Sequence, residues 1–159
     1  MSKPFVVILM GSKADLEHCT RISDACKQFG LNTVLRVASA HKTAEHALTI
    51  LSKYEADPRP KVYITVAGRS NALSGFTDGF VSSPVIACPP PSEAFGGADV
   101  YSSLRMPSGI ASAVVLEPVN AALLAAKIIG LLDESVREQV RLSQKRAADK
   151  IIEDDAGVQ

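Results

Sequence analysis

Five short apolar runs alternate along the chain with segments of helical periodicity, and this alternation limits the possible folds more than any other feature. The runs are rich in valine and isoleucine and are apolar at nearly every position, which is typical of parallel strands covered on both faces. Alternating strand and helix patterns predict an α/β fold, a doubly wound parallel sheet with right-handed crossovers. The predicted strands are residues 5–10, 33–38, 61–67, 84–88 and 111–116.

Two amphipathic stripes lie between the first three predicted strands. The first ends at Gly30, a typical helix stop, and the second ends before the prolines of "DPRP". Cys19 and Cys26 lie on the first stripe, where free thiols pack as small apolar groups. We expect the stripe residues to face the core: Leu16, Cys19, Ile22, Cys26 and Phe29 in the first helix, and Ala44, Ala47, Leu48, Leu51 and Tyr54 in the second.

The C-terminal part of the chain has a different pattern. Residues 121–132 are apolar almost all round, so a helix there needs cover on more than one side. Residues 133–155 are polar, with a narrow apolar stripe at Val136, Val140, Ala147 and Ile151. Burying so thin an apolar stripe against its own domain would add little stability. We therefore interpret this segment as an extended helical arm that packs on neighbouring subunits. A frayed tail on a monomer is the alternative.

Composition restricts the functional class. With 159 residues, 47% of them hydrophobic and 21% charged, the chain is expected to form a single soluble domain over 1–159, with its core at 5–132 and its arm at 133–155. Seventeen basic and seventeen acidic residues cancel, which argues against nucleic acid as a partner. No apolar run reaches the roughly 20 residues of a membrane span, and no signal peptide pattern is seen. We therefore expect a cytoplasmic protein.

The three cysteines show no CxxC spacing, which argues against a metal site or a disulfide framework.

In a doubly wound sheet, ligands bind beyond the carboxyl ends of the strands. After the first predicted strand, Gly11, Ser12 and Asp15 form a turn whose backbone N–H groups favour an anion. Asp15 is a candidate acceptor for ribose hydroxyls. Plain helix capping by these residues, with Asp15 as the cap, is the alternative.

His41 follows the second predicted strand, between Ser39 and Lys42. Imidazole titrates near neutral pH and can both accept and donate a proton, so its place at a strand end indicates a functional role. Ser39 and Lys42 are candidates for contact with a phosphate. His18 and His46 lie inside helical patterns and are interpreted as surface residues.

The third predicted strand ends in Gly68, Arg69, Ser70 and Asn71. Arginine offers a planar fork for phosphate or carboxylate, and serine and asparagine offer neutral hydrogen bonds to a planar group. A capped helix start with a solvated arginine explains this turn equally well in isolation. Three such turns meeting at one edge of the sheet favour a small anionic ligand.

Residues 89–109 contain enough proline and glycine for an ordered loop, and long ordered loops in compact domains are often functional. We interpret this loop as a pocket lid that buries Phe95, Tyr101, Leu104 and Met106. The alternative is that these four residues belong to the core or to an interface.

Four motifs in sequence order, "MGSKAD", "SAHKTAEH", "AGRSNALSGF" and "DVYSSLRMPSGIASAVVL", resemble the 5-aminoimidazole ribonucleotide (AIR) carboxylase family of purine biosynthesis. This family also contains the N5-carboxyaminoimidazole ribonucleotide mutases. The resemblance covers about residues 5–132. It implies a three-layer αβα, flavodoxin-like fold, a homo-octamer with sites between subunits, and catalysis without a metal or another cofactor.

The resemblance also implies residue roles. His41 matches the proton-transfer histidine of the family, and Ser12, Asp15 and Ser39 match positions that hold the ribose phosphate end of the substrate. Lys42 matches a position near the phosphate. We assign Gly11, Gly68 and Arg69 to the substrate as well, and Ser70 and Asn71 to carbon dioxide, which the carboxylase branch holds at this turn. Ala14 replaces a serine that is common in the family, so one hydroxyl contact to the phosphate is lost.

Two departures from the mutase pattern distinguish the branches. Lys42 stands where mutases usually have arginine, and "AGRSNALSGF" lacks their second histidine. These features predict a direct carboxylase that adds carbon dioxide to carbon 4 of AIR. The alternative is the mutase of the same pathway, and a remoter one is a non-catalytic nucleotide- or flavin-binding module.

Overall fold

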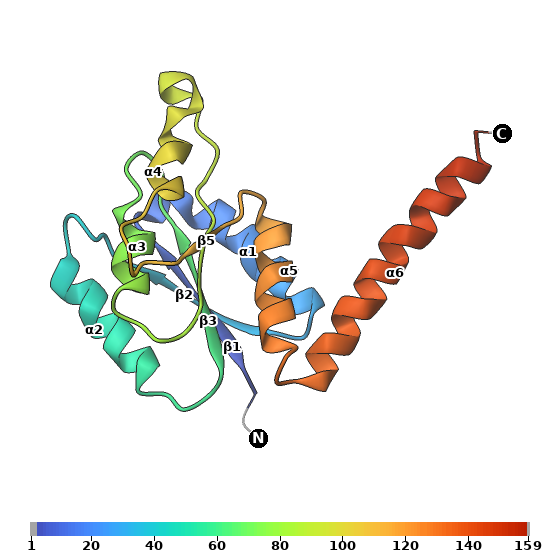
Figure 1. Cartoon of the computed structure of the whole chain (residues 1–159), viewed down its shortest axis with the longest axis horizontal. Helices are drawn as coiled ribbons and strands as arrows, with labels where there is room; N and C mark the ends of the chain where they lie inside the picture. Colours follow the sequence, from blue (N-terminus) through green and yellow to red (C-terminus); the bar gives the residue numbers. More distant parts are fainter. Residues whose placement is uncertain (1–2, 159) are drawn as a thin grey trace.

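The computed structural model describes residues 3–158 and contains a five-stranded parallel sheet in the order β2-β1-β3-β4-β5 (Figure 1). The strands are β1 (Phe5–Met10), β2 (Asn32–Val37), β3 (Lys61–Val66), β4 (Val85–Ala87) and β5 (Ala113–Val114). This is the flavodoxin-like doubly wound order, and all five predicted strands are confirmed. The last strand is shorter than predicted, because it lies at the sheet edge and pairs only with the three-residue β4.

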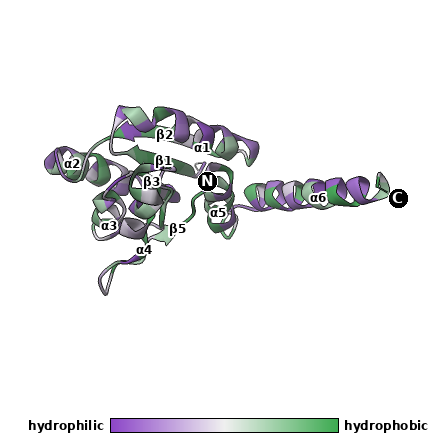
Figure 2. Cartoon of the chain, turned by 90° about the horizontal axis from the view of Figure 1, so that it is seen from above, coloured by the Kyte–Doolittle hydropathy of each residue, from purple (hydrophilic) through white to green (hydrophobic). Residues whose placement is uncertain are grey.

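Helices cover both faces of the sheet, which gives the three predicted layers (Figures 1 and 2). The longer helices are α1 (Leu16–Gln28), α2 (Ala44–Glu55), α3 (Ala72–Asp78), α5 (Pro118–Ile129) and α6 (Glu134–Ala156). Three short elements add to them: the 3-10 helices η1 (Lys13–Asp15) and η2 (Ala94–Val100), and the helix α4 (Tyr101–Leu104). No helix within residues 3–158 is long and apolar enough to cross a membrane.

Two apolar cores lie on the two sides of the sheet, because successive residues of a strand point to opposite faces. From β1, Val6 and Ile8 pack with residues of α1 and α5, whereas Val7 and Leu9 pack with residues of α2 and α3. Every residue of β1 is buried. This double cover explains why the strand is apolar at consecutive positions.

The predicted core stripe of α1 is correct for Cys19 and Cys26, which are fully buried, but wrong for Leu16, which is 40% exposed. Leu16 is the first residue of the helix and lies at the open carboxyl edge of the sheet, where fewer elements cover it. The prediction that His18 is a surface residue is also wrong. Its side chain is only 8% exposed because it faces the thiol of Cys88 at the end of β4.

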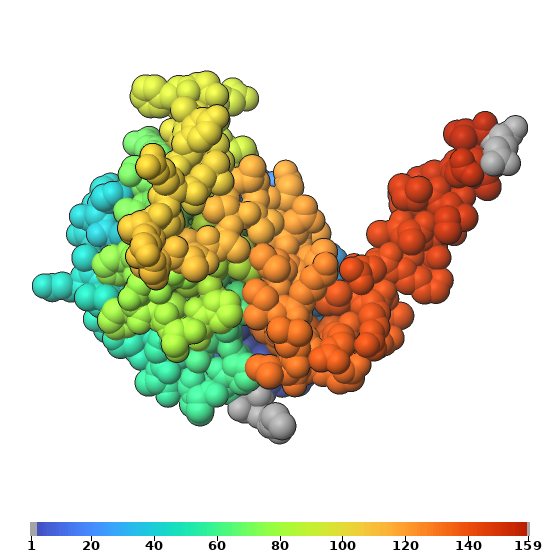
Figure 3. All heavy atoms as spheres, viewed as in Figure 1, coloured from blue at the N-terminus to red at the C-terminus, as the bar shows by residue number. Residues whose placement is uncertain are grey.

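The predicted helix 121–132 ends earlier, at Ile129. Leu131 and Leu132 lie in the short connection to α6 and are 74% and 73% exposed, because Asp133 caps the next helix through hydrogen bonds from the N–H groups of Ser135 and Val136. Of the predicted stripe on α6, Val136 and Val140 are buried while Ala147 and Ile151 are exposed. Figure 3 shows α6 extending away from the body of the domain.

The loop at residues 89–109 contains η2 and α4 and projects above the carboxyl edge of the sheet (Figures 1 and 3). Phe95 is 89% exposed and Tyr101 is 70% exposed. The prediction that the loop's large apolar side chains are buried is therefore wrong for Phe95, Tyr101 and Leu104, because no other part of residues 3–158 covers them. Met106 is half-buried and packs against Gly75 of α3.

Candidate active site

A cavity of about 710 Å³ opens at the carboxyl ends of β1, β2 and β3. It lies at the switch point of the sheet, where the chain turns from β2 on one side of β1 to β3 on the other. Every site residue predicted from the sequence except Asn71 lines this cavity. The tertiary structure therefore brings together three turns that are about thirty residues apart in sequence.

The turn after β1 is capped by Ser12. Its Oγ accepts a hydrogen bond from the N–H of Ala14 at 3.2 Å. Asp15 precedes α1 but makes no capping hydrogen bond with its side chain, so the alternative with Asp15 as the cap is wrong. Burial raises the pKa of the Asp15 carboxyl, and the nearby His18 partly offsets that rise. A carboxylate that is not used for capping can accept hydrogen bonds from a ligand.

The turn after β2 is held by Ser39 and Thr43. The Oγ1 of Thr43 accepts from the N–H of Ser39 at 2.9 Å, and the Oγ of Ser39 accepts from the N–H of Lys42 at 3.3 Å. This compact turn leaves His41 exposed at the cavity wall. Within the described residues, no protein group forms a hydrogen bond to its imidazole ring, so both ring nitrogens face solvent or a substrate.

The turn after β3 places Arg69 in the left-handed region, with φ of +57°. Ser70 is exposed and lines the cavity. Asn71 is only 3% exposed: its Oδ1 caps α3 by accepting from the N–H of Ser74, and its Nδ2 donates to the Oγ of Ser103 at 2.8 Å. The side chain of Asn71 is thus used inside the protein, and Ser70 supplies the hydroxyl at the cavity.

The loop after β4, which its prolines and glycines predict to be a pocket lid, contributes Pro90, Ser92 and Asp99 to the cavity wall. These three residues could not be predicted from the sequence, because no spacing rule indicates which residues of a loop reach a site. Ala14 also lines the cavity, at the position where a serine would add a hydroxyl.

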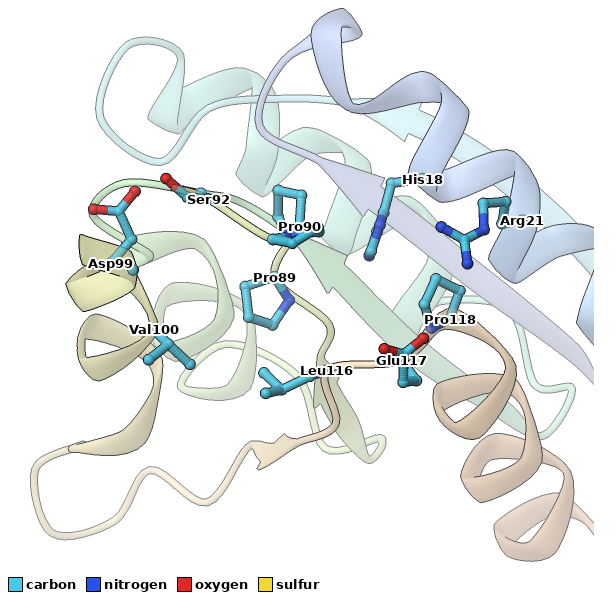
Figure 4. A pocket seen from close by; sticks show the side chains of 13 residues that line it. His18, Arg21, Pro89, Pro90, Ser92, Asp99, Val100, Leu116, Glu117 and Pro118 are labelled. Carbon is cyan, nitrogen blue, oxygen red and sulfur yellow. The ribbon is translucent and has the colours of Figure 1, made fainter. Parts of the chain in front are cut away.

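A second cavity of about 410 Å³ adjoins the first and shares Gly68, Pro90, Ser92 and Asp99 with it (Figure 4). His18 and Arg21 of α1 point into it, opposite the wall formed by the loop after β4. Burial lowers the pKa of His18, so this imidazole is neutral at pH 7. This cavity could not be predicted from the sequence, because His18 is buried by a contact with Cys88, which is distant in sequence.

The described residues contain no cluster of three or more histidine, cysteine, aspartate or glutamate side chains placed to hold a metal ion. What the cavity does present is a serine turn, an ammonium group, an imidazole and a guanidinium group at one edge of the sheet. Such a set of groups at the switch point is typical of flavodoxin-like α/β proteins that bind a small anionic ligand.

Comparison with known proteins identifies the family within this class. The model of the family described as "AIR carboxylase" matches residues 5–150. A phosphoribosylaminoimidazole carboxylase of Treponema denticola is 58% identical over 154 residues, which are 97% of each chain. An Archaeoglobus fulgidus protein of the same name is 57% identical over 134 residues, or 84% of this chain and 73% of that one. The chain belongs to the AIR carboxylase family.

The structural comparison agrees over the full length. The crystal structure of Treponema denticola PurE superimposes with a TM-score of 0.97 at 57% identity and covers 99% of both chains. The family match reaches Lys150, well into α6, and so extends beyond the segment 5–132 that resembles the family by its motifs. The extended C-terminal helix is therefore part of the family's pattern.

Proposed function

We propose that this protein is a phosphoribosylaminoimidazole carboxylase, a carboxy-lyase of purine biosynthesis. It adds carbon dioxide to carbon 4 of AIR and forms 4-carboxy-5-aminoimidazole ribonucleotide. The observation that carries the proposal is the convergence of the three strand-end turns on one cavity, with His41, Ser70 and Ser12 on its wall. The names of the Treponema and Archaeoglobus relatives support it.

The nucleotide's charged end is assigned to the turns after β1 and β2. Ser12 and Ser39 donate hydroxyl hydrogen bonds to the phosphate, and Lys42 provides a positive charge beside it. Asp15 accepts hydrogen bonds from the ribose hydroxyls. Gly11 and Gly68 also line the cavity and are assigned to the substrate. This assignment leaves the imidazole ring of AIR facing His41 and the turn after β3.

The chemistry follows from the electronic structure of AIR. Its amino group pushes electron density onto carbon 4, which attacks carbon dioxide and forms a carbon–carbon bond. Negative charge develops on the new carboxylate, and Ser70 and Arg69 stabilise it by donating hydrogen bonds. His41 then accepts the proton from carbon 4, and the ring regains its aromaticity. Because carbon dioxide has no leaving group, this route uses neither ATP nor biotin.

Lys42 and the absence of a second histidine from the turn after β3 favour the carboxylase over the mutase of the same family. The purified protein is tested with AIR at increasing concentrations of dissolved carbon dioxide, and separately with N5-carboxyaminoimidazole ribonucleotide. We expect product formation from AIR that depends on carbon dioxide. Turnover of only the N5-carboxylated nucleotide would establish the mutase instead, and no turnover of either would refute the proposed function.

We also propose that the protein works as a homo-octamer. Support comes from large apolar side chains that the described chain leaves exposed on and near α6: Leu131, Leu132, Leu142, Ile151 and Ile152. Large apolar side chains left exposed along one element are typical of association surfaces. Light scattering coupled to size-exclusion chromatography measures the particle mass, and a monomer would contradict this proposal.

A further inference from the structure

The turn that carries Arg69 and Ser70 has a strained backbone. Arg69 has φ of +57°, a left-handed conformation that side chains other than glycine rarely adopt. Such a residue keeps its conformation only where the surrounding structure holds it there. Residues in this state often lie at functional sites, and Ser70 beside it faces the cavity. The groups that hold this turn therefore matter for the site.

The hydroxyl of Ser102, on α4, is placed to hold the turn. Its Oγ accepts a hydrogen bond from the N–H of Asn71 at 2.9 Å. Its single O–H has two carbonyl oxygens within hydrogen-bond distance as acceptors, that of Asp99 at 2.8 Å and that of Arg69 at 3.2 Å. Because Asn71 and Arg69 flank Ser70, one hydroxyl contacts the backbone on both sides of the cavity serine.

Ser103 adds a second connection between α4 and the same turn. Its Oγ accepts from the Nδ2 of Asn71 at 2.8 Å, and both residues are buried, at 1% and 3% exposure. Hydrogen bonds between buried groups are expensive to break, because the separated partners are left without water. Asn71 thereby links the start of α3 to α4.

The segment after α4 is anchored along α3, so the two serines stand on a fixed support (Figure 1). A Cβ atom on Gly75 would lie 3.0 Å from the Sδ of Met106, and one on Gly79 would lie 3.0 Å from the Cδ1 of Ile110. Glycine at both positions permits this close approach. The N–H of Ala111 also donates to the carboxylate of Asp78 at 2.7 Å.

We propose that Ser102 is a positioning residue that fixes the Arg69–Ser70 turn for catalysis, together with Asn71 and Ser103. The proposal rests on the proposed function, in which this turn stabilises the developing carboxylate. Donors that stabilise a transition state must already be in place when charge develops. Loss of the Ser102 hydroxyl leaves the nucleotide's phosphate contacts intact but lets Ser70 move away from the carbon dioxide.

The test compares Ser102→Val with Ser102→Thr, two side chains of similar shape of which only threonine keeps the hydroxyl. We expect Ser102→Val to lower kcat by about tenfold and to raise the carbon dioxide concentration for half-maximal rate. The dissociation constant of AIR should stay within about twofold of wild type. Ser102→Thr should restore kcat. Ser108→Ala is the control, because Ser108 is an exposed serine of the same segment with no hydrogen bond from its hydroxyl within the described residues.

Two kinetic results would overturn the proposal: unchanged kcat and carbon dioxide dependence in Ser102→Val, or equal losses of kcat in the valine and threonine variants. A crystal structure of Ser102→Ala is a second readout that needs no activity. We expect Arg69 to leave the left-handed region in this structure, and an unchanged turn would refute the positioning role of Ser102. An inactive wild-type protein would refute only the proposed function, since the crystallographic test of Ser102 does not depend on activity.

Discussion

The Nε2 of His18 lies 3.4 Å from the Sγ of Cys88, which joins the first turn of α1 to the end of β4. Both side chains are buried. Burial lowers the pKa of His18 and raises the pKa of Cys88 to about 12. Both groups are therefore neutral at pH 7, and His18 of this pair lines the second cavity.

The pH dependence of stability should report on His18. Its pKa in the folded protein lies below the unfolded value of about 6.5, so the unfolded chain binds this proton more tightly. The contribution of neutral His18 to the free energy of unfolding is fully present above about pH 6.5. It is lost as the pH falls from that value toward the lower folded pKa. Urea denaturation at several pH values between 7 and 5 measures how steeply the free energy of unfolding changes with pH.

We expect the loss of unfolding free energy between pH 7 and pH 5 to be smaller in His18→Gln than in wild type. The matched control is His46→Gln, because His46 is exposed on α2. An identical pH slope in wild type and His18→Gln would show that His18 does not cause the effect.

Glu55 at the end of α2 connects α2 to the segment before β4. Its carboxylate accepts from the hydroxyl of Tyr63 at 3.0 Å, from the hydroxyl of Ser83 at 2.9 Å, and from both the N–H and the hydroxyl of Ser82 at 3.0 Å. Burial by itself raises the pKa of Glu55, but these hydrogen bonds together lower it. Only an ionised carboxylate accepts all four bonds.

Glu55→Gln should therefore lower the free energy of unfolding at pH 7 by about 1–3 kcal/mol. The folded pKa is depressed, so the contribution of Glu55 is present above its unfolded pKa of about 4.5 and is lost as the pH falls below it. Guanidinium denaturation should show the difference between wild type and variant narrowing toward pH 3.5. Glu153→Gln, at an exposed site on α6, serves as the control. A difference that stays constant with pH would contradict this account.

The proposed role of His41 gives a direct kinetic prediction. His41→Asn keeps a polar side chain at the cavity wall but removes the proton acceptor, so kcat should fall by about 10²–10⁴-fold. The affinity for AIR, measured by calorimetry without carbon dioxide, should change little. His46→Asn is the control, since His46 does not line the cavity. Near wild-type turnover in His41→Asn would remove His41 from the mechanism.

The local sequence pattern was sufficient to predict the strands and most of the residues that line the main cavity. The apolar strands could be predicted because double burial leaves consecutive apolar residues, and the strand ends could be predicted to meet because parallel strands share a carboxyl edge. His41 and Ser12 follow strands directly, so their place at the cavity needed only the sheet. The ends of β5 and α5 were predicted less well, because edge pairing and the cap at Asp133 decide them.

The sequence by itself determined the α/β fold, the family resemblance and the nine residues that line the cavity from the strand ends. Only the tertiary structure decided that His18 is buried against Cys88, that Asn71 turns inward to Ser103, and that Ser102 holds the turn before α3. Each of these contacts joins residues at least thirty positions apart. Periodicity and capping rules describe neighbours in sequence, and contacts of this range depend on how the packed elements meet in space.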